Sequence, residues 1–383
     1  MENPNNHIKN KLKFNLQEIS GGFGDLGTFI PIALALILIC KMDAFSVLFW
    51  AGIMNIISGI IFRLPIPVQP IKAIATIAIA EGLSIGEIHA AGLSVGIIIF
   101  ILGITGLVKK ISISVPKAVV WGILLGIGSK LIFKGMSFIF KDNLNQTSVF
   151  APLFLSIGFI SAGFYLKKFP SALLVFILGI VLIIFRSRIP IDIGNMELSG
   201  FVFTFPGRSD WFTGFTICAL PQVPLTLLNS VIAVSALSGN LFPGRAVNET
   251  RMALSVSAMN LVACLFGGMP MCHGSGGLAG QYRFGARSGG SVVFIGTVKV
   301  LTAFILGNEA INILKEYPQN ILGLLLMAAG IELIRPALKK QKIPYVFITA
   351  ATAILIFIFN TAIRFCAGLL LYSANHFILE KKS

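Results

Sequence analysis

Charged residues are scarce in this sequence. Only 12% of its 383 residues are Asp, Glu, Lys or Arg, whereas 56% are hydrophobic and the mean hydropathy is +0.89. This balance excludes an ordinary water-soluble domain and is typical of a polytopic membrane protein. Basic residues outnumber acidic ones by 30 to 15, but they stand in short loops rather than on one face. We therefore expect the lipid bilayer, and not nucleic acid, as the partner.

Cysteine is rare as well, and so are groups that could hold a metal. The odd number of five cysteines, scattered in or beside apolar runs, predicts small buried side chains rather than a disulfide framework. Cys272 stands next to His273, but no second cysteine or histidine follows at ligand spacing, so we expect neither a metal nor a cofactor. Paired carboxylates are also lacking, which argues against an enzyme. No apolar signal segment precedes the first long apolar run.

Long apolar runs are abundant instead. A helix needs about 20 residues to cross a bilayer, and twelve runs reach or approach that length. They lie at 25–40, 44–62, 88–108, 115–134, 149–166, 169–185, 211–237, 252–268, 291–307, 320–334, 344–359 and 361–379. Two further segments, 67–82 and 270–284, are too short or too rich in glycine to cross as ordinary helices. The sequence therefore predicts an all-α membrane protein with 14 transmembrane segments.

The distribution of basic residues predicts the orientation. If the N-terminus is cytoplasmic and all segments change sides, 19 Lys and Arg residues fall in inner loops and 8 in outer loops. This bias agrees with the positive-inside rule. We expect an integral protein of the plasma (inner) membrane with both termini in the cytoplasm.

The chain divides into two halves of seven segments. We expect residues 1–20 to form a cytoplasmic N-terminal segment, 21–186 and 211–379 the two repeats and 187–210 the linker, and we expect no soluble domain after the last span. An odd number of segments makes the second half enter from the opposite face, so the repeat must be inverted. Each half opens with a proline inside its first span, in GDLGTFIPIALAL and ALPQVPLTLLNS, and in each half the third segment is the short one.

The two short segments, PVQPIKAIA (67–75) and PMCHGSGGLAG (270–280), indicate a binding site. Gly- and Pro-interrupted segments at matching places in two halves are typical of the substrate site of a secondary transporter. A proline allows a half-helix to begin just after it. The N-terminus of that half-helix carries about +0.5 of an elementary charge and unpaired N–H groups. Two such ends facing each other near the bilayer midplane would bind an anion.

Six residues are candidate anion ligands: Thr28, Gln69, Gln222, His273, Gly274 and Ser275. An amide NH₂ group donates to an oxyanion without adding a full charge that would block release. Gln69 and Gln222 could instead satisfy the local backbone beside their prolines. We expect His273, Gly274 and Ser275 to contribute backbone N–H groups and the Ser275 hydroxyl. His273 could also titrate near neutral pH, although a helix N-terminus opposes its protonation.

Two charged residues could act beside these ligands. Lys72, one turn into the first half-helix, either attracts the dianion or pairs with Asp25 or Glu81. Asp25 is an N-cap of the first span, a salt-bridge partner or a proton carrier.

Other features have a structural interpretation. Glu332 and Lys299 are isolated in their spans, so we expect them to be structural. Gly122 and Gly126 form a GxxxG pattern, which predicts close helix packing. The glycine-rich stretches GGFGDLG and GSGGLAG lack the GK[ST] ending of a nucleotide-binding loop.

The stretches GDLGTFIPIALAL, PVQPIKAIA and PMCHGSGGLAGQYRFGARSGG resemble the MFS-type molybdate transporter family, distant relatives of the sulfate permeases. The resemblance covers nearly the whole chain. It implies a seven-plus-seven inverted fold with a core domain (21–110 and 211–308) and a gate domain (111–186 and 309–379). It also implies molybdate uptake.

The leading hypothesis is secondary active transport of a tetrahedral oxyanion, most of all molybdate, by movement of the core against the gate. Sulfate or tungstate transport by the same fold is the next alternative. A proton-coupled nucleobase carrier would want carboxylates on the broken segments, where Gln222 and His273 stand. A passive anion channel would need a charge-lined pore, which is not apparent. Coupling to protons through Asp25 or His273, coupling to sodium, and simple exchange all stay open, as does a homodimer.

Overall fold

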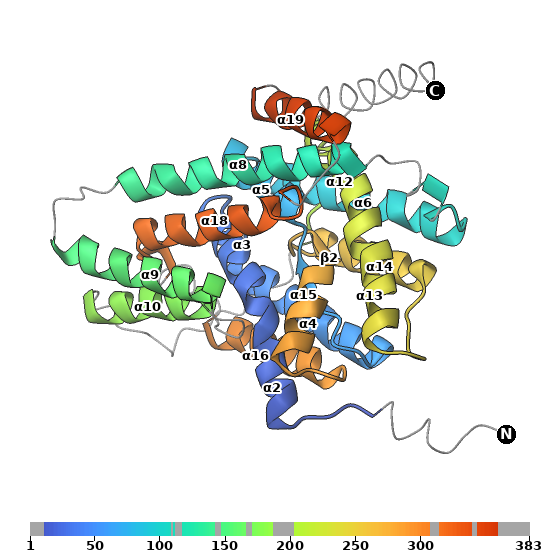
Figure 1. Cartoon of the computed structure of the whole chain (residues 1–383), viewed down its shortest axis with the longest axis horizontal. Helices are drawn as coiled ribbons and strands as arrows, with labels where there is room; N and C mark the ends of the chain where they lie inside the picture. Colours follow the sequence, from blue (N-terminus) through green and yellow to red (C-terminus); the bar gives the residue numbers. More distant parts are fainter. Residues whose placement is uncertain are drawn as a thin grey trace.

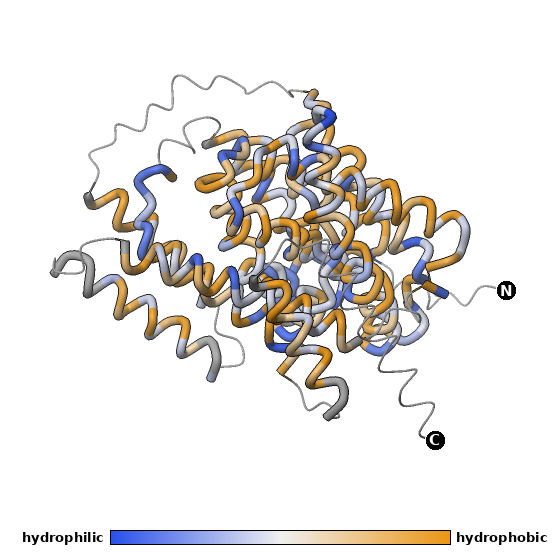
Figure 2. Tube along the Cα trace, turned by 90° about the horizontal axis from the view of Figure 1, so that it is seen from above, coloured by the Kyte–Doolittle hydropathy of each residue, from blue (hydrophilic) through white to orange (hydrophobic). Residues whose placement is uncertain are grey.

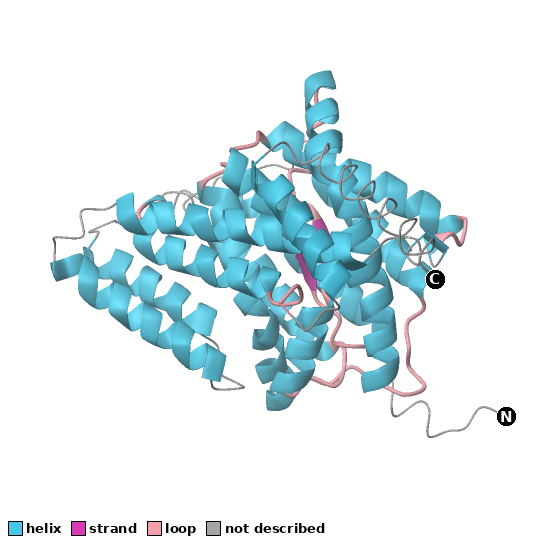
Figure 3. Cartoon of the chain, turned by 45° about the horizontal axis from the view of Figure 1, so that its top comes forward, coloured by secondary structure: helices cyan, strands magenta, loops and turns pink. Residues whose placement is uncertain are grey.

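The computed structural model describes residues 11–108, 110–111, 117–141, 147–165, 171–186, 203–306, 314–338 and 343–358. Most of these residues are helical, and within these ranges two short strands lie near the centre of the molecule (Figures 1 and 3). The protein is thus a helical bundle built around one small pair of strands.

The first half contains these elements in chain order: α2 (Leu16–Gly22), the 3-10 turn η1 (Phe23–Asp25), α3 (Leu26–Leu38), α4 (Ala44–Phe62), β1 (Val68–Pro70), α5 (Lys72–Glu81), α6 (Ile85–Ile104), α8 (Lys117–Lys141), α9 (Thr147–Tyr165) and α10 (Ser171–Arg186).

The second half contains α11 (Arg208–Thr213), the π-helical turn η2 (Gly214–Ala219), α12 (Leu220–Leu225), the π-helical turn η3 (Thr226–Ile232), α13 (Ala233–Leu241), α14 (Glu249–Leu265), β2 (Met271–His273), α15 (Ser275–Phe284), α16 (Gly290–Leu306), α18 (Gln319–Ile334) and α19 (Ile343–Ile358).

The first thirteen predicted segments each overlap one of these helices or strand–helix units, and the fourteenth, at 361–379, lies outside the described residues. The first helical rod is longer than predicted. It begins at Leu16 rather than at residue 25, because Asn15 caps it by accepting from the Glu18 amide at 3.0 Å. The residues before 25 are glycine-rich and polar, so hydropathy did not mark them. They nevertheless pack closely: a Cβ on Gly24 would lie 2.6 Å from the Gly280 carbonyl oxygen.

The surface of the helices fits a bilayer. Among the described residues, five rods have at least 18 residues and enough apolar character to span: Leu16–Leu38, Ala44–Phe62, Ile85–Ile104, Ala118–Phe140 and Arg208–Leu241. Hydrophobic residues run along most helices (Figure 2). Large apolar side chains such as Phe100 and Ile104 of α6 and Leu301 and Ile305 of α16 are exposed. Such surfaces are expected to face lipid tails.

Small residues bring several helices into close contact. The close packing predicted at Gly122 and Gly126 is confirmed, because Cβ atoms there would lie 2.5–2.6 Å from side chains of α19. On the same helix α8, a Cβ on Gly128 would meet Gly330 and Ile334 of α18. The helices α8 and α18 lie side by side (Figure 1). The helix α4 packs on α16 and α6 on α14, so each of these pairs joins one half of the chain to the other.

The rod Arg208–Leu241 is irregular in its middle. Pro221 and Pro224 stand inside or at the start of α12, and π-helical turns flank this helix on both sides. Proline supplies no amide donor, so the regular hydrogen-bond ladder cannot continue unchanged through this region. Irregular turns of this kind are frequent at functional sites.

Candidate functional site

The two broken segments meet at the strands. β1 and β2 pair antiparallel, with Gln69 opposite Cys272 in the middle of the register. The Ile71 amide then donates to the Pro270 carbonyl at 2.9 Å. Immediately after the strands, α5 begins at Lys72 and α15 begins at Ser275, so the N-termini of both half-helices leave the same small sheet.

Each strand is held by one buried asparagine. The Asn55 carboxamide of α4 accepts from the Val68 amide at 3.0 Å and donates to the Val68 carbonyl at 3.4 Å. The Asn260 carboxamide of α14 makes the same two contacts with Met271, at 2.9 and 2.6 Å. Both side chains are completely buried. These asparagines fix the position of the strands and satisfy buried backbone groups that would otherwise lack a partner.

The matching of the two halves extends beyond the asparagines. Both half-helices have 10 residues, and each ends at a glycine in the left-handed region: Gly82 with φ +71° and Gly285 with φ +117°. A glycine adopts this conformation without steric cost. The weak repeat in the sequence therefore corresponds to a repeated structural unit of asparagine, strand, half-helix and terminal glycine.

A cavity of about 370 Å³ lies against the starts of both half-helices. Six of the predicted site residues line it, namely Gln69, Lys72, Gln222, His273, Gly274 and Ser275. Leu225, Asn229 and Ser230 contribute from α12 and η3, and Leu124, Glu332 and Leu333 contribute from α8 and α18. A volume of this size is usual for a small-molecule site.

The helix ends at this cavity lack side-chain caps among the described residues. Lys72 and Ala73 line the cavity from α5, and Gly274, Ser275 and Gly276 line it from α15. The first N–H groups of a helix have no acceptor within the helix. Both ends therefore offer amide donors and partial positive charge to whatever the cavity contains.

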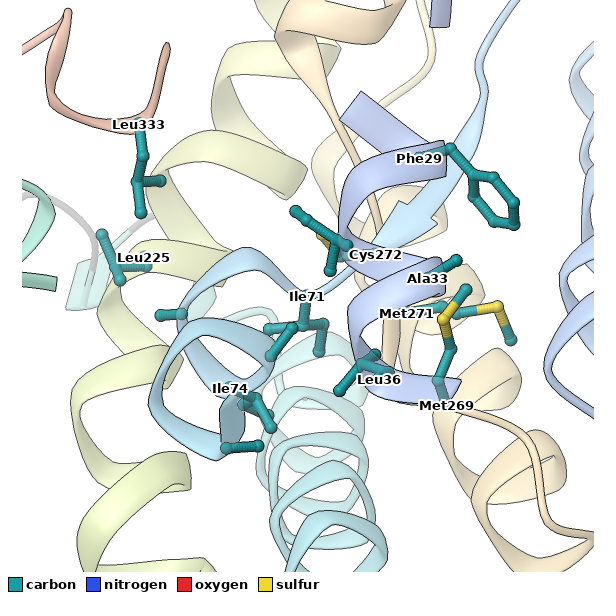
Figure 4. Packing of buried hydrophobic residues seen from close by; sticks show 14 of the residues in the cluster. Phe29, Ala33, Leu36, Ile71, Ile74, Leu225, Met269, Met271, Cys272 and Leu333 are labelled. Atoms are coloured by element: carbon teal, nitrogen blue, oxygen red, sulfur yellow. The ribbon is translucent and has the colours of Figure 1, made fainter. Parts of the chain in front are cut away.

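Apolar side chains surround the start of α5. Ile71 and Ile74 pack beside Ala33 and Leu36 of α3, and Leu225 and Leu333 lie on the cavity side (Figure 4). One side of the cavity is thus bounded by a hydrophobic core, which strengthens electrostatic interactions beside it.

The Gln69 side chain is positioned by Asp25. The Gln69 Nε2 donates to Asp25 Oδ1, while Gln69 Oε1 and Asp25 Oδ2 are buried without a hydrogen-bond partner among the described residues. Gly277 permits this arrangement, because a Cβ there would lie 2.5 Å from both Asp25 Oδ1 and Gln69 Nε2. The interpretation of Asp25 as an N-cap is wrong: its carboxylate caps no amide of α3 and lies behind Gln69 instead.

His273 offers the cavity its backbone rather than its ring. Its Nδ1 lies 3.1 Å from the Pro67 carbonyl, and its Nε2 lies 2.9 Å from the Ser255 hydroxyl. A carbonyl only accepts, so Nδ1 carries a hydrogen, and in a neutral ring Nε2 then accepts from the Ser255 hydroxyl. The neutral ring is thus fully satisfied. Gln222 is also partly engaged, since its Nε2 donates to Thr226 Oγ1 at 2.8 Å, but its Oε1 has no partner in the described part of the chain.

Thr28 does not reach the main cavity. Its hydroxyl donates to the Glu332 carboxylate over long distances of 3.4 and 3.5 Å, and it lines a separate small cavity. Of the alternatives for Lys72, the pairing with Glu81 is wrong as well. Glu81 forms an ion pair with Lys130 of α8, with 2.6 Å between Nζ and Oε1, while Lys72 lines the main cavity.

Sequence reasoning missed several cavity residues. Glu332 was expected to be structural, but it lines the cavity together with Arg335, Asn229 and Ser230. An acidic residue inside an apolar span was a usable signal. Lys299 lies over the Phe29 ring, with 3.5 Å between its Nζ and the ring centroid, and does not line this cavity.

Comparison with protein families identifies the family of this chain. The family described as "Molybdate transporter of MFS superfamily" matches residues 17–131 and 214–333, which is more than half of the chain. The chain belongs to the molybdate transporter family. It is 37% identical to Molybdate transporter 1 of Arabidopsis thaliana, over 95% of this chain and 90% of that one. It is 38% identical to Molybdate transporter 2 of the same plant, over 85% and 79% of the two chains.

Solved structures with low sequence identity share the fold of this molybdate transporter family member. The transmembrane domain of the cyanobacterial bicarbonate transporter BicA matches with a TM-score of 0.67 and 16% identity, over 93% of this chain and 96% of that one. SLC26A9 matches with a TM-score of 0.71 and 12% identity, over 95% of this chain and 65% of that one.

These matches confirm the predicted family, the all-α polytopic membrane fold and the class of transporter rather than enzyme. The count of fourteen segments stays a prediction, because the last one lies outside the described residues.

Proposed function

We propose that this protein takes up molybdate across the membrane by alternating access, with tungstate and sulfate as competing anions. The observation that carries the proposal is the cavity at two uncapped half-helix N-termini that are tied together by one strand pair. Membership of the molybdate transporter family, whose Arabidopsis members are named for molybdate, supports the choice of anion.

The chemistry of the cavity suits a tetrahedral oxyanion. Such an anion has acceptors on all sides, and the cavity supplies donors from two directions: the first amides of α5 and those of Gly274, Ser275 and Gly276. The Ser275 hydroxyl and the Lys72 ammonium add to these. Gln69 Nε2 carries two N–H groups: one donates to Asp25 Oδ1, and we assign the second to the anion. Most of these donors are neutral amides, which limits the strong charge pairing that would slow release of a dianion.

Alternating access would come from movement between two groups of helices. The half-helices belong to the proposed core (21–110 and 211–308), and α8 and α18 of the proposed gate (111–186 and 309–379) line the opposite side of the cavity. Anion sites between such groups are typical of transporters with inverted repeats. We also propose that the protein lies in the plasma membrane with both termini in the cytoplasm. We propose a proton as the coupling ion and a homodimer as the assembly.

Binding to purified variants tests this site. Removing a hydrogen bond to a charged group costs about 1.5–3 kcal/mol, so Gln69→Ala and Ser275→Ala should each weaken tungstate binding by roughly tenfold to a hundredfold. The controls are Gln17→Ala on α2 and Ser137→Ala on α8; both residues are exposed and lie outside the cavity, so these variants should bind like the wild type. Unchanged affinity in both site variants would remove this assignment.

A further inference from the structure

Glu332 is an unexpected residue in a cavity for an anion. Its side chain is exposed in the described part of the chain and lines the main cavity together with Lys72 and Arg335. A carboxylate and a dianion repel each other, so its presence weakens anion binding unless the carboxylate becomes neutral. This position therefore needs a functional explanation.

Glu332 also lines a second, much smaller cavity of about 10 Å³. Its polar lining consists of Thr28, Thr76, Lys72 and Glu332. Thr76 Oγ1 is buried and has no hydrogen-bond partner among the described residues, while the Thr28 hydroxyl donates to Glu332. A volume of about 10–15 Å³ with two to four polar partners is enough for one water molecule. We call this small cavity the niche.

Glu332 lies where the niche and the main cavity meet, together with Lys72 and Leu333, which also line both. Along α18, Ala329 lines the niche alone, Arg335 just after the helix lines the main cavity alone, and Glu332 lines both. Along α5, Thr76 lines the niche and Ala73 the main cavity. In the predicted orientation α5 runs outward, so the niche lies on the outer side of Glu332 and the main cavity on its inner side.

The charges around Glu332 sum to zero when a dianion and one proton are bound. Lys72 from α5 and Arg335 from its own helix face the same cavity, and Lys130 of α8 is already paired with Glu81. Asp25 of η1 lies close enough to interact electrostatically with Glu332, but the Lys299 ammonium of α16 acts on the Asp25 carboxylate in the opposite sense. Lys72, Arg335 and the ionised Glu332 together give the main cavity one net positive charge. A dianion makes this one net negative charge, and protonation of Glu332 restores neutrality.

We propose that Glu332 binds the proton that accompanies each molybdate dianion. The carboxylate takes one proton from water in the niche, which removes the repulsion and allows the anion to bind at the half-helix ends. When the main cavity opens to the inner side, the anion and the proton leave together, and the ionised carboxylate opposes rebinding. This role rests on the proposed function, since it assigns the coupling ion to the same site.

Proton uptake on binding tests the role without any variant. Molybdate is added to purified protein in a weakly buffered solution near neutral pH, and a pH indicator reports protons taken up per anion bound. The wild type should take up about one proton for each molybdate. Glu332→Asp should keep this uptake, Glu332→Gln should bind molybdate without it, and Glu316→Gln, an exposed acid before α18, should match the wild type.

Transport in proteoliposomes gives a second measurement. An acidic outer solution should drive molybdate accumulation by the wild type and by Glu316→Gln, whereas Glu332→Gln should show exchange that no longer depends on pH. The role is overturned if the wild type binds molybdate without proton uptake, if Glu332→Gln takes up the same protons, or if only a sodium gradient drives accumulation. Absence of molybdate binding by the wild type would overturn the proposed function itself and this inference with it.

Discussion

Replacing Asn260 by leucine should destabilise the site without changing any residue that lines the cavity. The Asn260 carboxamide satisfies both the amide and the carbonyl of Met271, which is completely buried. Leucine has a similar size but can neither donate nor accept. Each buried group left without a partner costs about 1–3 kcal/mol, so the two groups together cost about 2–6 kcal/mol. Asn55→Leu should have the same effect on Val68.

The assay combines thermal denaturation with tungstate binding. Because β2 leads directly into α15, a displaced strand moves the amides of Gly274 and Ser275. If only 1.4 kcal/mol of the cost falls on the bound state, affinity drops tenfold. Asn248→Ala is the matched control: this asparagine caps α14 by accepting from the Arg251 amide at 2.8 Å. The Asn248→Ala variant should lose about 1 kcal/mol of unfolding free energy but keep the wild-type affinity for tungstate.

The reasoning is refuted if Asn260→Leu denatures at the same temperature as Asn248→Ala and binds tungstate like the wild type. The strand would then be held by its pairing with β1 alone.

Two further predictions concern glycine and the ion pair. Gly277→Ala should lower tungstate affinity at least tenfold, because its Cβ would lie 2.5 Å from Asp25 Oδ1, whereas Gly158→Ala on α9, outside the cavity, has nothing within 4 Å of its Cβ and should bind normally. Equal affinities of the two variants in a binding titration would contradict this. Lys130→Met should favour separation of α8 from α5, because it removes the 2.6 Å ion pair with Glu81 between the proposed gate and core. Double electron–electron resonance between spin labels on α5 and α8 should show a longer distance, and an unchanged distribution would oppose a role of this pair in closure.

The positions of the membrane segments followed from hydropathy, and the broken segments followed from their glycines and prolines. Both signals are local, since they reflect burial and backbone freedom at the residue itself. The asparagines that hold the strands were missed, because nothing near Asn55 or Asn260 in the sequence identifies Val68 or Met271 as their partners. The partnership exists only once the helices pack.

The charged residues were harder to assign for the same reason. Glu332 is isolated along the chain but not in space, where Thr28 of the other half contacts it. Asp25 precedes a helix, as a cap would, yet the tertiary contact with Gln69 takes its carboxylate away from the helix end. The role of a polar side chain in a membrane protein depends on which helix faces it.

A structure determined with bound tungstate tests the central claim most directly, since tungsten can be located by its anomalous scattering. We predict the anion in the main cavity, within hydrogen-bonding distance of the first amides of α15 at Gly274–Gly276 and close to the start of α5 at Lys72. Tungstate bound elsewhere, with both half-helix ends free of the anion, would contradict the proposed site.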